Sequence, residues 1–144
     1  MDVTADRQTC WSTLTDVPQL VTWVSVLERS EEVTPLDRYT AVLADRLGPF
    51  KLRADVDITL TDVRPGEHVV VHAEGEDRQV GSRIVVDAVL DISDRDAGGS
   101  TVSVDGAYEV TGRVASMGSS TIRKKADKIL DEFFGHLSSS LGGL

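Results

Sequence analysis

The middle of the chain alternates between apolar and polar side chains with a period of two, and no other feature constrains the fold as much. From Phe50 onward the odd positions are polar or charged, and the even positions are apolar: Leu52, Ala54, Val56, Ile58 and Leu60. Successive side chains of a strand point to opposite faces of a sheet, so this pattern predicts a strand with one buried and one solvated face.

The same alternation returns in further segments of the chain. It begins again at Val69, at Ile84 and at Val102, and weaker versions cover Val26–Thr34 and Tyr39–Leu47. Glycine and proline pairs separate these segments where hairpin turns need them. The sequence therefore predicts a long antiparallel meander.

The two ends of the chain follow a helical period instead. Thr4 or Asp6 can cap a short helix near the N-terminus, and Asp16 can start a second one. After Gly112 the apolar residues recur every three to four positions, which predicts one long amphipathic helix from about Ser116 to Leu141. Residues 136–144, rich in serine and glycine, are expected to fray.

A sheet with one apolar face and a long amphipathic helix bury their apolar surfaces by packing together. The predicted fold class is therefore α+β, with a curved antiparallel sheet of about six to seven strands around the C-terminal helix and two short helices near the N-terminus. The 144 residues are expected to form a single domain, residues 1–144.

Composition excludes several classes of protein. The formal net charge of −9 disfavours binding to nucleic acid, and no apolar run is long enough for a membrane span. A single cysteine, Cys10, permits neither an internal disulfide nor a cysteine-based zinc site. We predict a soluble, cytoplasmic protein. The one basic run, residues 123–125 with Lys128, is interpreted as a solvated helix face.

No familiar catalytic or cofactor motif is present, and we predict no cofactor and no metal. His68 and His72 resemble a ligand pair by spacing, but on a strand they would lie about 13 Å apart and on the polar face. Cys10 lies on the apolar side of its helix, where a thiol acts as a small hydrophobic residue.

Several segments resemble the START-like (SRPBCC) superfamily and, within it, the family of the G subunit of carbon monoxide dehydrogenase. The matching segments are Trp11–Asp16, Leu47–Pro49, Leu60–Pro65 and Gly112–Phe134. The resemblance implies a helix-grip fold. It also implies a lipid-like ligand such as a quinone, and an oxidoreductase of the carbon monoxide dehydrogenase type as partner.

The N-terminus departs from the family pattern, because only residues 1–3 precede the first helix where a full strand is usual. Either this strand is lost, or another chain supplies it, or the true start lies upstream. Without this first strand, the last strand, Thr101–Thr111, lacks a hydrogen-bonding neighbour, and we predict a homodimer or a tight partner at that edge.

The inward positions of the strands and of the helix define the predicted site, an apolar ligand cavity between the two. Its expected lining residues are Trp23, Tyr39, Leu43, Asp45, Phe50, Leu52, Ala54, Val71, Val86, Ala88, Tyr108, Met117, Thr121, Ile129 and Phe133. Asp45 is the one carboxylate in the inward phase. Either it faces the cavity as a polar anchor, acid or base, or the strand bends and exposes it to solvent.

Three functions are compatible with these residues. A carrier of a hydrophobic small molecule or lipid fits an inner face that is almost free of ionisable groups. A polyketide cyclase or aromatase would need polar groups for proton transfer, and only Asp45, Tyr39 and Tyr108 could serve. The third is a protein-interaction module whose interior is filled by side chains.

Overall fold

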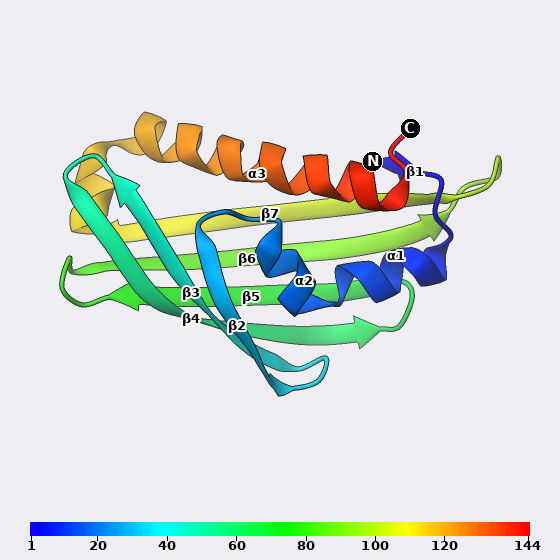
Figure 1. The fold of residues 1–144 in the computed structure, drawn as a ribbon, viewed down its shortest axis with the longest axis horizontal. Coiled ribbons are helices and arrows are strands. Elements are labelled where there is room, and N and C mark those ends of the chain that lie inside the picture. Colours follow the sequence, from blue (N-terminus) through cyan, green and yellow to red (C-terminus); the bar gives the residue numbers. More distant parts are fainter.

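The computed structural model, which describes residues 1–144, is built on one antiparallel sheet of seven strands in the order β1-β7-β6-β5-β4-β3-β2 (Figure 1). The strands are β1 (Asp2–Val3), β2 (Leu27–Thr34), β3 (Arg38–Leu47), β4 (Phe50–Arg64), β5 (His68–Asp77), β6 (Ser82–Asp94) and β7 (Ser100–Gly112). The helices are α1 (Arg7–Leu14), α2 (Val17–Thr22), the 3₁₀ turn η1 (Arg113–Met117) and α3 (Ser119–Leu141). The predicted curved sheet with a long C-terminal helix is confirmed.

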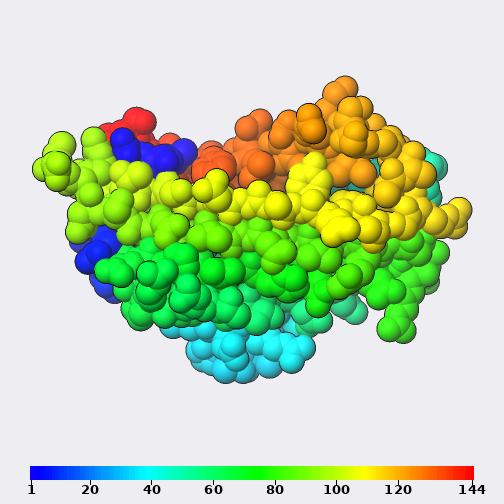
Figure 2. Space-filling view, turned by 180° about the vertical axis from the view of Figure 1, so that it is seen from behind, coloured from blue at the N-terminus to red at the C-terminus, as the bar shows by residue number.

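The strands pair in the register that their alternation predicts. Ile58 of β4 faces Ala73 of β5, which faces Val86 of β6, which faces Tyr108 of β7. These apolar residues all belong to the face of the sheet on the side of α3, which we call the inner face. The alternate side chains of the same strands point to the opposite side and form the outer face of the sheet. Seen from behind, this face is continuous, and α3 lies along its upper border (Figure 2).

The two short helices begin at the expected carboxylates. Asp6 caps α1 by accepting a 2.7 Å hydrogen bond from the backbone N–H of Thr9, and Asp16 caps α2 through the N–H of Gln19. Both helices direct apolar side chains to the inner face, and the buried core lies between them, the sheet and the end of α3. No helix is long and apolar enough to cross a membrane.

The long helix ends at Leu141 as predicted but begins later than predicted. It begins at Ser119 rather than at about Ser116, because residues 113–117 form the tighter turn η1. Gly112 starts this turn with φ 88°, and a side chain there would collide with the carbonyl oxygen of Gly81. This explains the glycine that opens the motif from Gly112 to Phe134.

The expectation that residues 136–144 fray is wrong. Leu137 and Leu141 are fully buried, and Gly142 ends α3 in a left-handed conformation. The carbonyl of Gly142 accepts a 2.8 Å hydrogen bond from the N–H of Thr4, and the N–H of Leu144 donates to the carbonyl of Asp2 at 2.9 Å. The two termini thus hold each other in place, side by side at one end of the molecule (Figure 1).

Residues at the start of the chain do form a strand beside β7. β1 pairs with β7 through Asp2 with Thr101 and Val3 with Ser100, and Met1 exchanges backbone hydrogen bonds with Val102. No strand lies beside β7 from Ser103 to Gly112. The expected open edge is therefore present over most of β7, while its beginning is covered by residues of the same chain.

Candidate functional site

The inner face is fully covered only at one end of the molecule. Near the chain termini, α1, α2 and the last turns of α3 bury it. Towards the opposite end, Val86 is 37% exposed and Tyr108 is 46% exposed, although both are on the inner face. On α3, Leu130 is 48% exposed, and only Leu137 and Leu141 are buried. An apolar surface is thus accessible between the first half of α3 and strands β6 and β7.

Small residues keep this part of the inner face low. Ala88 faces Gly106 across β6 and β7, beside the pair Val86 and Tyr108. Because Ala88 and Gly106 have almost no side-chain volume, they cannot fill the space between the sheet and α3. Ile122, Ala126 and Ile129 of α3 therefore remain half-buried. The opening is therefore a consequence of side-chain size.

An ion pair joins the first half of α3 to the sheet. Lys125 Nζ lies 2.9 Å from Asp45 Oδ2 and 3.1 Å from Asp45 Oδ1, and the two side chains are 25% and 18% exposed. Asp45 is in register with buried Leu52, and β3 pairs with β4 without a break up to Leu47 and Phe50. The strand therefore does not bend away at Asp45, and a cation from the helix lies beside its carboxylate.

Lys125 also corrects the interpretation of the basic run as a wholly solvated helix face. It occupies the same helical row as Thr121 and Ile129, which were predicted to face inward, so its position alone could have identified it. It was missed because a lysine in a charged run is usually solvated.

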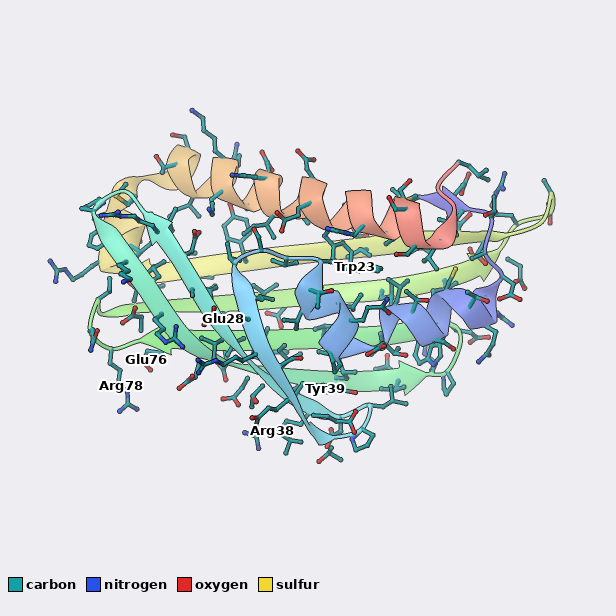
Figure 3. All side chains as sticks on the ribbon, in the orientation of Figure 1. Trp23, Glu28, Arg38, Tyr39, Glu76 and Arg78 are labelled. Carbon is teal, nitrogen blue, oxygen red and sulfur yellow. The ribbon has the colours of Figure 1, made fainter.

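A second set of contacts holds the middle of α3. Trp23 lies beneath the helix (Figure 3), with its ring centroid 5.6 Å from that of Phe133 and 6.1 Å from that of His136, which stacks on it. The carboxylate of Glu132 accepts hydrogen bonds from the backbone N–H and the hydroxyl of Ser25. The bond from the Ser25 N–H lowers the pKa of Glu132. These contacts mark the boundary between the closed core and the accessible surface.

The two tyrosines of the predicted site differ in their surroundings. Tyr39 is buried, and its hydroxyl accepts a 2.9 Å hydrogen bond from the N–H of Leu36 at the turn between β2 and β3. That oxygen is therefore directed away from α3. Tyr108 forms no hydrogen bond within the protein and exposes nearly half of its side chain on the inner face. Of the two, only Tyr108 offers a free hydroxyl.

The fifteen residues predicted to line the cavity differ in how far they are buried. Trp23, Tyr39, Leu52 and Ala54 are buried, and Val86 and Tyr108 are exposed. The half-buried ones are Leu43, Asp45, Phe50, Val71, Ala88, Met117, Thr121, Ile129 and Phe133. Phe50 lies at the end of the β3–β4 hairpin, where the guanidinium of Arg113 is 5.9 Å from its ring centroid.

Two hollows of the surface have mostly polar walls. One of about 420 Å³, at the β3–β4 hairpin, is lined by Ala44, Asp45, Arg46, Lys51, Leu52 and Arg53. The other, of about 710 Å³, has no apolar side chain in its wall and is lined by residues of β4, β5, β6 and the turn between β5 and β6, nearly all of them charged. Glu76 and Arg78 belong to it, and their side chains point away from α3 (Figure 3).

The two histidines of β5 lie on the outer face, as predicted. His68 Nδ1 is 2.7 Å from Asp91, and His72 Nδ1 is 2.5 Å from Asp87. The bond to Asp87 raises the pKa of His72. Each histidine is thus paired with a carboxylate of β6, and no group of three or more such side chains is arranged to hold a metal ion.

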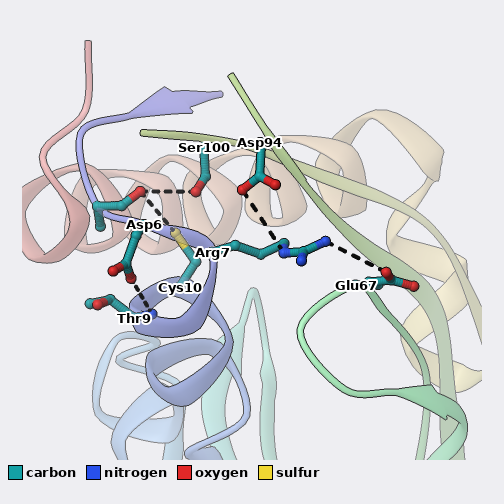
Figure 4. Close-up of polar contacts among 8 residues, drawn as sticks. Asp6, Arg7, Thr9, Cys10, Glu67, Asp94 and Ser100 are labelled. Atoms are coloured by element: carbon teal, nitrogen blue, oxygen red, sulfur yellow. Dashed lines mark hydrogen bonds and ion pairs between the residues drawn. The ribbon is translucent and has the colours of Figure 1, made fainter. Parts of the chain in front are cut away.

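Cys10 is fully buried where α1 meets β7 (Figure 4). Its thiol is 3.8 Å from the carbonyl of Ala5, which also accepts a 2.9 Å hydrogen bond from Ser100 Oγ. Burial raises the pKa of the thiol, which keeps it protonated and unreactive. The interpretation of Cys10 as a small core residue therefore fits its surroundings.

Comparison with known proteins gives a family and a fold. The model of the family described as the G subunit of carbon monoxide dehydrogenase (CoxG) matches residues 1–142. No curated protein matches the sequence.

Three solved structures share the fold at low sequence identity. A conserved protein from Geobacillus kaustophilus superposes with a TM-score of 0.80 at 22% identity, covering 94% of this chain and 87% of its own. A Deinococcus radiodurans protein has a TM-score of 0.57 at 14% identity, covering 91% and 94%. A Chromobacterium violaceum protein has a TM-score of 0.58 at 10% identity, covering 92% and 90%.

Proposed function

The chain belongs to the CoxG family, that of the G subunit of carbon monoxide dehydrogenase, and from this premise we propose that it is a carrier of a hydrophobic small molecule. The ligand is a lipid or a quinone held on the inner face, and the partner is a redox enzyme of the carbon monoxide dehydrogenase type. One observation carries the ligand proposal: Val86 and Tyr108 are exposed on a face that is otherwise the apolar interior.

The chemistry of the inner face supports a carrier better than an enzyme. Apolar groups left in contact with water lose stabilisation of about 25 cal/mol per Å², which a hydrophobic ligand would recover. The inward carboxylate of Asp45 is already paired with Lys125, that of Asp77 accepts backbone hydrogen bonds, and the Tyr39 hydroxyl is bonded to the backbone. Of the three groups that a polyketide cyclase could use, only the Tyr108 hydroxyl is free, and a single phenol supplies neither the base nor the second acid that such proton transfers need.

The carrier proposal predicts different effects on ligand affinity for two neighbouring substitutions on β6. Val86→Lys places a charge on the accessible inner face, whereas Val85→Lys places it on the outer face. We expect Val86→Lys to weaken binding of decylubiquinone or of a fluorescent fatty acid about tenfold or more, because burying a charge against a hydrophobic ligand is costly. Val85→Lys should change the affinity less than twofold. Fluorescence titration of purified protein measures both.

Analysis of the natural ligand completes the test. Solvent extraction of the purified protein followed by mass spectrometry should release a lipid or a quinone. If nothing is extracted and neither probe binds, the carrier proposal is wrong. Equal weakening by both lysine variants would place binding elsewhere than on the inner face.

A further inference from the structure

The edge strand β7 has a long stretch of unpaired backbone. Its pairing with β1 covers only Ser100 and Thr101, and Met1 adds two hydrogen bonds to Val102. From Ser103 to Gly112 nothing pairs with its outer side, and we call this stretch the β7 edge. Every residue of the β7 edge is exposed except Val104 and Val110, which are half-buried.

The other edge of the sheet is protected by its shape. The pairing of β2 with β3 is interrupted twice, between Glu28 and Glu31 and between Glu32 and Thr34, and Arg29 has a positive φ of 49°. Such bulges twist an edge strand and obstruct the addition of a further strand. In contrast, β7 pairs with β6 residue for residue from Ser100 to Gly112 without a break. The β7 edge is therefore the regular one.

The direction of its free backbone groups follows from Val102. Its N–H and carbonyl both bond to Met1, so they point away from β6. Because backbone groups alternate along a regular strand, the outward groups of the β7 edge belong to Val104, Gly106, Tyr108 and Val110. All four positions also belong to the inner face, to which the two valines and the tyrosine direct their side chains.

This geometry specifies the strand that would fit. Residues of an added antiparallel strand opposite Gly106 and Tyr108 would lie on the inner face, where apolar side chains could cover the exposed tyrosine. The alternate residues of the added strand, opposite Asp105, Ala107 and Glu109, would lie on the outer face. Asp87 and Asp91 of β6 are paired with histidines, whereas Asp105 and Glu109 form no ion pair. Basic side chains there would compensate two free carboxylates.

We propose that the β7 edge binds an extended segment of another protein in which apolar and basic residues alternate. A second copy of this chain does not fit. If two β7 edges paired antiparallel, Asp105 and Glu109 of one copy would lie opposite or diagonal to acidic residues of the other, and like charges across strands repel. The net charge of −9 adds to this repulsion.

The test uses a soluble peptide in which valine alternates with lysine, and a matched peptide with glutamate in place of lysine. We expect the valine–lysine peptide to bind and to slow amide hydrogen exchange at Val104, Gly106, Tyr108 and Val110. Amides of β2 should be unchanged. The valine–glutamate peptide should not bind, because it would add acidic residues next to Asp105 and Glu109.

Charge reversal at the two edges provides a matched pair of variants. Asp105→Lys with Glu109→Lys should weaken the valine–lysine peptide about tenfold or more and allow the valine–glutamate peptide to bind. Glu31→Lys with Glu32→Lys makes the same change of charge on β2, at two residues that also form no ion pair, and should alter either affinity less than twofold.

Several results would overturn the proposal. These are absence of peptide binding, equal weakening in both double variants, protection at β2 instead of β7, and a wild-type dimer that protects the β7 amides without peptide. The carrier proposal fails if the wild-type protein binds no lipid, quinone or fatty-acid probe, and this one fails if it binds no valine–lysine peptide, so the two failures give different results.

Discussion

At the scale of single residues, buried polar groups stabilise the protein where backbone groups would otherwise lack partners. Asp77 at the end of β5 is 6% exposed. Its carboxylate accepts hydrogen bonds from the backbone N–H groups of Arg53 at 2.8 Å, Gln79 at 3.0 Å and Val80 at 3.1 Å. These bonds, that of Arg53 first, hold the pKa of Asp77 below its ordinary value.

Replacement of Asp77 should have a pH-dependent cost. Asp77→Ala leaves three N–H groups without an acceptor and should destabilise the protein by about 1–3 kcal/mol near neutral pH. Because the pKa is lower in the folded state, the charged carboxylate contributes stability above its unfolded pKa, and this contribution is lost as the pH falls through the folded pKa.

Urea unfolding at a series of pH values measures the effect. The difference between wild type and Asp77→Asn, which keeps one acceptor oxygen but no charge, should be largest near neutral pH and shrink in acid. A difference that stays constant with pH would contradict the role assigned to the charge.

At the scale of elements, the two halves of α3 are held in different ways. Its last turns are buried against the core through Leu137 and Leu141, while its first half is joined to the sheet by the ion pair of Lys125 with Asp45 and has only half-buried apolar residues. The predicted apolar stripe is real, but burial depends on what lies opposite it. Phe133, which was predicted to line the cavity, is half-buried and packs on Trp23 at the boundary of the core.

Two leucines of α3 should therefore respond differently to truncation. Leu137→Ala leaves a cavity in the core and should cost about 2–5 kcal/mol. Leu130→Ala removes a side chain that is half exposed and should stay within about 0.5 kcal/mol of wild type. Chemical denaturation of the two variants measures both losses, and similar values would mean that the accessible surface is in fact closed.

At the scale of the whole molecule, the curvature of the sheet brings the β3–β4 hairpin up to the start of α3 (Figure 1). Asp45 and Lys125, 80 residues apart in sequence, meet there. This contact joins β3 to the first half of α3, on the open side of the inner face, where the two elements share few apolar contacts. We expect it to set the position of the first half of α3.

A double-mutant cycle measures this contact. Asp45→Ala and Lys125→Ala should each cost about 1–2 kcal/mol, because each leaves its partner partly buried without a counter-ion. The double variant should lose less than the sum, with a coupling of about 1 kcal/mol after allowing for solvent at the pair. Additive losses would show that the two side chains do not interact in solution.

The sequence by itself determined the elements and their faces. Strict alternation in β4 to β7, the carboxylates Asp6 and Asp16 before the short helices, and the helical period after Gly112 are local signals, and each matched the structure closely. Most inward positions were also assigned correctly, because side-chain direction follows from the period of the element alone.

Only the tertiary structure decided what those faces meet. The pairing of Lys125 with Asp45, the burial of Leu137 and Leu141 beside β1, and the exposure of Tyr108 all depend on residues far away in sequence. A serine- and glycine-rich C-terminus looks unstructured until a strand from the other terminus covers it. Local patterns give the face on which a residue lies but not the residue that it meets there, because the contact partner is set by the closure of the chain in space.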